Sequence, residues 1–412
     1  TIYIDVCNPL PDVVESQTLS LKGGAKHRFD CSEFKSGKAQ LTIATMPTID
    51  FGGAFSFVEN YSHYCTEQLS ARAIYMLYGR KFLSVEEQKR AEKALPSLLK
   101  NIESRQLSNG GFAYWPGNSE AHDWATSMVG EVMTEARRQG FAASSQCYDR
   151  WKEYQNSVAR RYRHSTTNAA DLMQAYRLYT LVLAGEQPTA AMNKLRESKS
   201  ISQQALLRLA AAYALAGRED VARKLLEKSN STKAINGSYA TFWSPLRDKA
   251  MALEAWLIAG DKTTAFKLVK EVADEFSATL SSTQEVAFVS IAMSRMGDVV
   301  GNSVPQIAIS DGNGAGRVIR NLKGVQQLAL STAQGFIEVE NQGNEEISLS
   351  LMLSRTPSAN EDVKPIFNGV EIDVQYADLK GNAITIDKLQ QGEEFLAKIR
   401  VKKTNDSSPS MA

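Results

Sequence analysis

Long apolar segments, histidine and an excess of either charge are all scarce in this sequence. No run of 18 or more apolar residues occurs, so we expect no segment that spans a membrane. The formal net charge is only +1, which gives no reason to expect nucleic acid or an anionic membrane surface as a partner. The four His and four Cys lack the spacing of a metal site, and there is no phosphate-binding loop, so neither metal nor cofactor is predicted.

The N-terminal sequence, TIYIDVCNPLPDV, lacks the basic region and the apolar core of a signal peptide. Strand-like residues begin at position 1, so we expect a fragment of a longer protein, with any targeting signal elsewhere. The 412 residues are 43% hydrophobic and 23% charged. This composition is typical of globular proteins, and the length allows two to four domains.

Strand signals lie at both ends of the chain, and helix signals lie between them. Up to about residue 48, apolar and polar residues alternate, as in QLTIATM. From about 54 to 300, apolar residues recur three and four positions apart, which predicts helices. After about 303, short alternating segments such as FIEVEN return, and SANEDVKP predicts a linker before two further strand segments. The order predicts a helical block inserted between two halves of one β module, followed by a partial β domain.

The helical block is predicted to consist of antiparallel helix pairs. Short turns at Gly217 and Gly260 separate the members of two such pairs. An array of this kind either extends as a solenoid or closes into an α/α ring, and the periodicity leaves both open. Two helix starts are predicted from capping boxes, Ser84 with Glu87 and Ser282 with Glu285.

The segment Cys65-Thr66-Glu67-Gln68 carries the most specific chemistry in the chain. Positions three apart lie side by side on a helical turn, so a Cys65 thiolate could attack the Gln68 side-chain carbonyl and expel ammonia. The product is an internal thioester, an acyl donor with a thiolate leaving group. The alternative is a buried structural cysteine, because a motif with three fixed residues also arises by chance.

The flanks of this motif resemble the alpha-2-macroglobulin family, the thioester proteins that include the complement components, and the bacterial members most of all. The segments that carry the resemblance are IATMPTIDFGGAFSFVENYSHYCTEQLSARA, LSNGGFAYWPGNSEAHDWATSMVGEVMTEARRQGF and LMQAYRLYTLVLAG. Only their combination is specific, and it covers nearly the whole chain.

The resemblance implies an α+β multidomain fold. Residues 49–302 would be the thioester domain, an α/α toroid, inserted in a small CUB-like β-sandwich. The two halves of that sandwich would be residues 1–48 and 303–355. Residues 356–412 would begin a C-terminal macroglobulin-like β-sandwich, cut short here.

The resemblance also assigns the site. Cys65 and Gln68 would form the thioester, and Glu67 would support it, although a solvated carboxylate fits the pattern equally well. Tyr61, at a position where bacterial members carry an aromatic residue, and Tyr64 would shield the bond from water, or would be ordinary core residues. Ser62 and Tyr64 replace the Pro and Gly that the family usually has, so this loop departs from the family pattern.

No histidine lies where complement proteins carry the one that directs the acyl group to hydroxyls. His63 and His164 are the nearest alternatives and fit a structural role better. The resemblance therefore implies an amine acceptor, such as a surface Lys of a captured protease.

Two further features have alternative interpretations. Trp115, Trp124 and Asp123 could suggest a sugar-binding toroid enzyme, but no paired carboxylate accompanies them, and turn and core packing is the preferred interpretation. Cys7 and Cys31 flank one β-like region and could form a disulfide, or could be two free thiols.

The function implied is that of a bacterial endopeptidase inhibitor, not an enzyme, that traps attacking proteases covalently. A complement-like surface protein or adhesin using the same bond is the alternative, and a toroid enzyme with an accidental motif is a weaker one. Its partners would be proteases and the rest of its own chain. The family implies a periplasmic or extracellular location with a membrane anchor outside this fragment.

Overall fold

The chain divides into two compact units, one of residues Val13–Arg355 and one of Thr1–Asp12 with Thr356–Ala412. None of the helices that the structure describes is both long and apolar enough to cross a bilayer. The structure is a computed structural model, and it describes residues 12–47, 49–141, 143–165, 169–230, 239–278, 282–300, 306–313, 316–320, 325–344, 346–358, 361, 370–386, 389–390 and 392–403.

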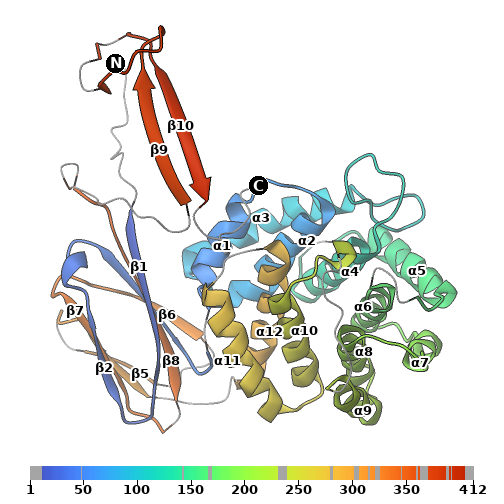
Figure 1. Ribbon diagram of the computed structural model, residues 1–412. Coiled ribbons are helices and arrows are strands. Elements are labelled where there is room, and N and C mark those ends of the chain that lie inside the picture. The colour runs from blue at the N-terminus through green and yellow to red at the C-terminus, as the bar shows by residue number, and fades with distance from the viewer. Residues whose placement is uncertain are drawn as a thin grey trace. The chain divides into compact units, whose positions relative to one another are not determined.

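The strands of the larger unit come from both sides of the helical block (Figure 1). They form two four-stranded sheets, ordered β1-β8-β3-β6 and β2-β7-β4-β5, and every pair is antiparallel. Strands from before and after the helical block thus pair with one another, and they do so in two sheets. The strands are β1 (Val13–Leu21), β2 (Lys26–Asp30), β3 (Lys38–Ala44), β4 (Ile307–Ser310), β5 (Arg317–Ile319), β6 (Val325–Leu330), β7 (Phe336–Asn341) and β8 (Ile347–Arg355).

Strand β8 shows why the two halves combine. Its alternating sequence buries Leu349, Leu351 and Leu353, and these residues join one hydrophobic cluster with residues of both sheets. The apolar face of such a strand must be covered by another layer, and here the second sheet covers it. Neither half of the β module carries enough strands to build this core alone.

The helical block begins and turns as the sequence predicts. Ser84 and Glu87 form the predicted capping box at the start of α3, and Ser282 caps α12 with Glu285. Gly217 and Gly260 have φ of +73° and +81° after α8 and α10, a conformation that favours glycine.

The helices are α1 (Phe51–Asn60), α2 (Thr66–Ile74), α3 (Val85–Glu103), α4 (Asp123–Arg138), α5 (Ser145–Arg161), α6 (Ala170–Leu183), α7 (Thr189–Arg196), α8 (Gln203–Leu215), α9 (Glu219–Ser229), α10 (Pro245–Ile258), α11 (Lys262–Ala278) and α12 (Thr283–Val300). A π-helical turn, η2 (Tyr75–Gly79), extends α2, and short 3₁₀ turns are η1 (Ser32–Phe34), η3 (Arg80–Phe82) and η4 (Tyr239–Thr241).

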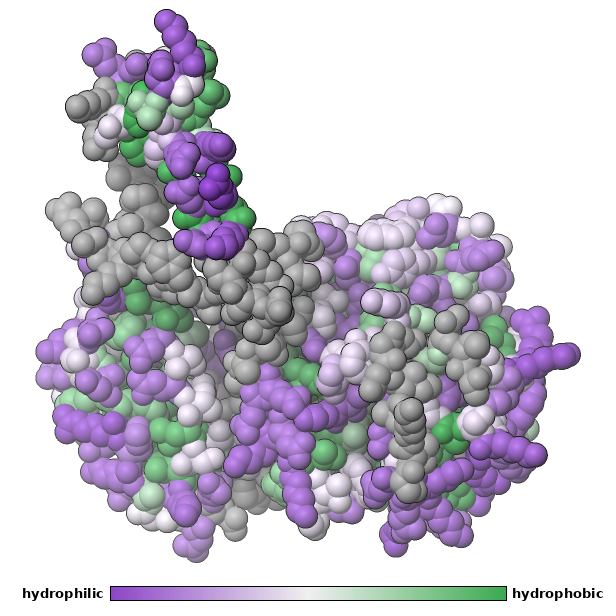
Figure 2. All heavy atoms as spheres, viewed as in Figure 1, coloured by the Kyte–Doolittle hydropathy of each residue, from purple (hydrophilic) through white to green (hydrophobic). Residues whose placement is uncertain are grey.

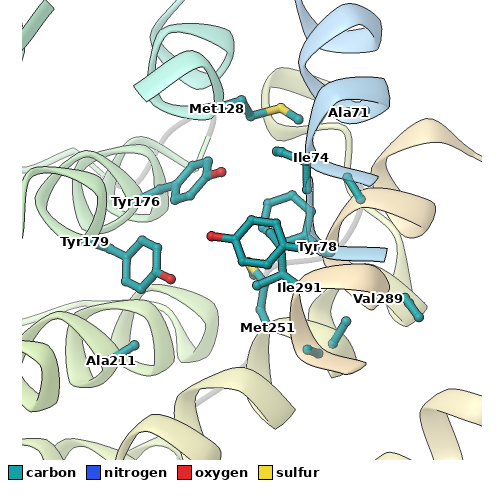
Figure 3. Close-up of a cluster of buried hydrophobic side chains, with 14 of the residues drawn as sticks. Ala71, Ile74, Tyr78, Met128, Tyr176, Tyr179, Ala211, Met251, Val289 and Ile291 are labelled. Carbon is teal, nitrogen blue, oxygen red and sulfur yellow. The ribbon is translucent and has the colours of Figure 1, made fainter. Parts of the chain in front are cut away.

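The even-numbered helices contact one another in chain order, from α2 through α4, α6, α8 and α10 to α12. Helix α12 in turn contacts α2, and α3, α5, α9 and α11 each contact members of this set. Their facing residues form one large hydrophobic cluster. Figure 3 shows Tyr78 of η2 and Tyr176 and Tyr179 of α6 pointing into the same interior region.

The smaller unit contains an antiparallel pair, β9 (Val370–Ala377) and β10 (Leu396–Lys403). Several apolar side chains of this hairpin are exposed, among them Ile372 and Ile399, and Figure 2 shows hydrophobic residues on its surface. Two strands are too few to bury an apolar face. That this hairpin begins a larger β domain stays a prediction.

Candidate functional site

Helix α2 begins at the predicted motif. Cys65 is the residue before its first turn and is fully buried. The Cys65 N–H donates to Gln68 Oε1 at 3.1 Å, and the Cys65 sulfur accepts from backbone N–H groups of this turn. This is a reciprocal capping box with Cys in the place of Ser or Thr. The helix start therefore holds the thiol and the amide side by side.

The same hydrogen bond has a chemical consequence. In any attack on the Gln68 side-chain carbon, negative charge develops on Oε1, the atom that the Cys65 N–H already contacts. A fixed N–H aimed at that oxygen stabilises the tetrahedral intermediate. Burial raises the pKa of the Cys65 thiol, while hydrogen bonds from Tyr114 and from the Gln68 backbone lower it. Cys65 is thus a shielded thiol with several donors around its sulfur.

Glu67 is buried, with 3% of its surface exposed, and is not a solvated carboxylate. It accepts from Thr283 Oγ1 at 3.1 Å and from Gln284 Nε2, and so joins the start of α2 to the start of α12. Its Oε2 lies 3.9 Å from the Cys65 sulfur. Burial raises the pKa of Glu67 to about 7, because its partners are neutral and compensate only in part.

The two predicted shielding tyrosines differ. Tyr61 is half-buried, packs against Phe57, and its hydroxyl hydrogen-bonds to the Gln68 side chain. Burial raises the pKa of Tyr61. Tyr64 is 50% exposed, so it covers the site less than Tyr61 does. The structure brings Tyr61 to the Gln68 side chain, and shielding by Tyr61 or Tyr64 stays a prediction.

Sequence reasoning missed Tyr114. Its side chain hydrogen-bonds to the Cys65 sulfur, and its carbonyl accepts from Thr66 N at 2.9 Å. Tyr114 also packs against His122 and Phe242, with ring centroids 4.9 and 6.0 Å away. The signal in the sequence was only an aromatic residue in a Gly-rich segment, because nothing in the spacing links position 114 to position 65.

The other aromatic and acidic residues of this region have structural surroundings. Trp124 is fully buried, as the core interpretation predicted. Trp115 is 45% exposed in a turn, where its N–H contacts Asn118. Asp123 forms a 2.7 Å salt bridge with Arg177.

The histidines offer no evident base for the site. His63 is exposed and contacts Ser62 at 3.1 Å, and His164 contacts Ser200. His122, which the sequence interpretation did not consider, lies against Tyr114, but its Nδ1 accepts the Ala125 N–H at 3.2 Å. Burial lowers the pKa of His122. Its neutral ring therefore carries the proton on Nε2, and Nδ1 is already occupied.

Two further predictions concern cysteines and metals. Cys31 is buried in the core between the two sheets. Cys7 lies outside the described residues, so a Cys7–Cys31 disulfide stays a prediction. Within the described ranges, no three His, Cys, Asp or Glu side chains gather in a way that could hold a metal ion.

Comparison with known proteins shows curated relatives in bacteria. The chain is 24% identical over 395 residues to the alpha-2-macroglobulin of Escherichia coli, which covers 89% of this chain and 23% of the relative. It is 23% identical over 401 residues to the Yersinia pestis homolog, covering 88% of this chain and 19% of the relative. No family model matches. The chain thus spans about a fifth of the length of the curated relatives it matches.

Solved structures give the same answer for the fold. Native E. coli alpha-2-macroglobulin, from domain MG7 to the C-terminus, superimposes with a TM-score of 0.68 at 18% identity, covering 96% of this chain and 65% of that one. Salmonella alpha-2-macroglobulin reacted with methylamine gives 0.68 at 20% identity, covering 95% and 27%. The resemblance to bacterial alpha-2-macroglobulins predicted from the motif and its flanks is confirmed.

Proposed function

We propose that this chain, similar in sequence and fold to bacterial alpha-2-macroglobulins, is the thioester-bearing part of a covalent protease inhibitor. The observation that supports this most is the reciprocal capping box of Cys65 and Gln68 at the start of α2. It holds a buried thiol beside an amide whose oxygen already accepts an N–H. Its role is that of a single-use acyl donor and not of an enzyme.

The chemistry follows in two steps. The Cys65 thiol gives up its proton and its sulfur attacks the Gln68 side-chain carbon; the carbon–nitrogen bond breaks, the nitrogen takes up that proton and leaves as ammonia, and a thioester forms. Later an amine attacks the same carbon, the carbon–sulfur bond breaks, and the electron pair remains on the Cys65 sulfur. The amine loses its proton to water and is joined to Gln68 by an amide bond. The N–H of Cys65 stabilises the oxyanion in both steps.

The surroundings support storage of the bond. Tyr61 hydrogen-bonds to the Gln68 side chain and Tyr114 to the Cys65 sulfur, and both place an aromatic ring beside the pair. Thr283 and Gln284 hold Glu67 and thereby fix the first turn of α2 against α12. A bond closed within this turn is screened on several sides by groups from distant parts of the chain.

For the fold we propose that the six even-numbered helices, which contact one another in succession and return from α12 to α2, form an α/α toroid. The two sheets would be a CUB-like sandwich with halves in 1–48 and 303–355, around the thioester domain 49–302. The β9–β10 hairpin would belong to the start of a macroglobulin-like domain, 356–412. The succession of helix–helix contacts supports the toroid. The hydrophobic core that the two sheets share supports the sandwich.

For the partners we propose attacking proteases, trapped through amines such as surface Lys. The E. coli relative has been solved in forms activated by porcine elastase and by trypsin. Periplasm or cell surface is the location that such bacterial relatives suggest. Because the chain spans only part of these relatives, bait and anchor would belong to other parts of the full-length protein.

The test is the reaction of the native full-length protein with methylamine. We expect one thiol per chain to become titratable, and the mass to rise by one methylamine at Gln68. The Cys65→Ala variant is the control and should neither release a thiol nor gain mass. A Cys65 thiol that reacts freely before methylamine is added, beside an unmodified Gln68, would refute the thioester.

A further inference from the structure

Arg105, in the loop after α3, has an unusual environment. Only 7% of its surface is exposed, yet its Nε and Nη1 atoms have no hydrogen-bond partner among the described residues. Buried N–H groups of a cation that have no acceptor are unfavourable for folding. Such a group calls for an explanation other than stability.

The backbone places Arg105 beside the site. The Arg105 carbonyl accepts from Ala113 N at 3.1 Å, and the Ala113 carbonyl in turn accepts from the Thr66 hydroxyl. The next residue, Tyr114, hydrogen-bonds to the Cys65 sulfur. Arg105 thus belongs to the same group of hydrogen-bonded residues that contacts the first turn of α2.

The charges around Cys65 explain what this cation could do. Burial and the Glu67 carboxylate both raise the pKa of the Cys65 thiol, and Tyr61 and Tyr114 are neutral phenols. Burial lowers the pKa of Arg105, and a charged Cys65 raises it, so the two charges interact favourably. The positive charge of Arg105 therefore acts on a charged Cys65 in the opposite sense to Glu67.

We propose that Arg105 stabilises the thiolate that Cys65 becomes when an amine opens the thioester. The inference rests on the proposed thioester. As the carbon–sulfur bond breaks, its electron pair moves to the sulfur, inside a buried site where an isolated thiolate is unfavourable. The fixed guanidinium lowers the cost of that charge and itself gains or loses no proton. Arg105 thereby speeds aminolysis without touching the acyl group.

The experiment compares native full-length protein with Arg105→Met and Arg105→Lys variants. Two quantities are measured: the rate of thiol release by methylamine, and the pH profile of iodoacetamide alkylation of the released Cys65 thiol. For Arg105→Met we expect release about tenfold slower and a thiol pKa higher by about one unit, which correspond to the same free energy. Arg105→Lys keeps the charge and should stay near the wild type in thiol pKa.

A matched control separates charge from loop structure. Arg150 donates to the Leu107 and Ser108 carbonyls at 2.8 Å and so supports the same loop from α5. Arg150→Gln should loosen the loop and leave the Cys65 pKa unchanged. If Arg105→Met does not fold, Arg105→Gln, which retains donors without charge, takes its place.

The outcomes are distinguishable. If the wild type releases no thiol, the proposed thioester fails, and the alkylation profile of the already free Cys65 still reports whether Arg105 lowers its pKa. If the wild type releases thiol but Arg105→Met and Arg105→Gln match it in rate and in thiol pKa, the inference about Arg105 is overturned and the thioester stands.

Discussion

Two buried glutamates, Glu67 at the edge of the helical block and Glu254 in its interior, differ in pKa. Both are at most 3% exposed. Burial raises the pKa of Glu67 to about 7, because Thr283 and Gln284 are neutral donors. Burial acts on Glu254 in the same direction, but the positive charges of its arginine partners outweigh it and lower the pKa to about 2.

The surroundings of Glu254 form a compensated cluster. Glu254 accepts from Arg208 at 2.6 Å, from Arg295 at 2.8 Å and from the Tyr179 hydroxyl at 2.6 Å. These partners come from α8, α12 and α6, so the carboxylate joins helices across the interior. Figure 3 shows Tyr179 at this place in the core. Two guanidinium groups thus surround one carboxylate, so the buried negative charge of Glu254 is compensated.

Around Glu67, by comparison, the hydrogen-bond partners carry no positive charge that would compensate the carboxylate. Its hydrogen-bond donors among the described residues are neutral, and the Cys65 sulfur lies 3.9 Å away. Perturbed pKa values of this kind cluster at functional sites, where charge is arranged for chemistry at some expense of stability. The comparison indicates that the charge of the partners, and not the depth of burial, sets the direction in which the pKa of these two glutamates is shifted.

The largest difference should appear when the reactive atoms are removed. Cys65→Ala and Gln68→Ala should each abolish covalent capture of an attacking protease by the native full-length protein. Because the cysteine side chain is small, unfolding free energy should change by only about 1 kcal/mol for Cys65→Ala. Covalent adducts are counted on denaturing gels, and stability is measured by urea unfolding. Adducts that persist in Cys65→Ala would place the reactive bond elsewhere.

Removing the charge of Glu254 should lower stability and leave the reaction with methylamine unchanged. Glu254→Gln leaves Arg208 and Arg295 without their carboxylate, so unfolding free energy should fall by about 3–5 kcal/mol. Methylamine-released thiol per folded molecule should stay at one per chain. Asp220→Asn removes an exposed partner of Arg218 at 3.7 Å and should cost less than about 1 kcal/mol. Equal losses of unfolding free energy in Glu254→Gln and Asp220→Asn would show that the buried carboxylate stabilises the fold no more than an exposed one.

Glu67 should make stability fall as pH rises. Its pKa is about 7 in the folded protein and about 4.5 when unfolded. Between these values the unfolded chain releases the proton first, so unfolding free energy decreases from pH 4.5 to pH 7 and then levels off. Glu67→Gln should remove on the order of 2 kcal/mol of this decrease.

Urea unfolding at several pH values measures this slope. Glu131, whose pKa burial also raises to about 7, leaves a residual slope in the Glu67→Gln variant. Glu120→Gln, at an exposed position, is the matched control and should behave as the wild type. A Glu67→Gln profile as steep as that of the wild type would show that Glu67 is not the titrating group.

The smallest effect is expected from His63. The exposed ring contacts Ser62, so His63→Ala should change the ratio of amine to hydroxyl acylation by less than about twofold, since a hydroxyl needs a positioned base and an amine does not. Competition between glycerol and a Lys-like amine in activated full-length protein, read by mass at Gln68, measures this ratio. Preferential ester formation that disappears in His63→Ala would assign the acceptor chemistry to that ring.

Local features were predictable because they depend on neighbours in the chain. The Ser84–Glu87 cap, the Gly217 turn and the side-by-side placement of Cys65 and Gln68 each arise within a few residues. The strand alternation of β8 also gave its buried face. The pairing of early with late strands followed from the order of segments, but their division into two sheets did not, since alternation gives a face and not a neighbour.

What the sequence by itself determined is the adjacency of Cys65 and Gln68, because a residue that caps a helix and the third residue of that helix face each other in a capping box. Only the tertiary structure decided what surrounds that pair. Gln284 reaches Glu67 across 217 positions of sequence, and Tyr114 and Arg105 arrive from loops. Such contacts depend on how whole helices pack. That packing placed neutral partners around Glu67 and charged partners around Glu254. The pKa of one glutamate is therefore raised and that of the other lowered.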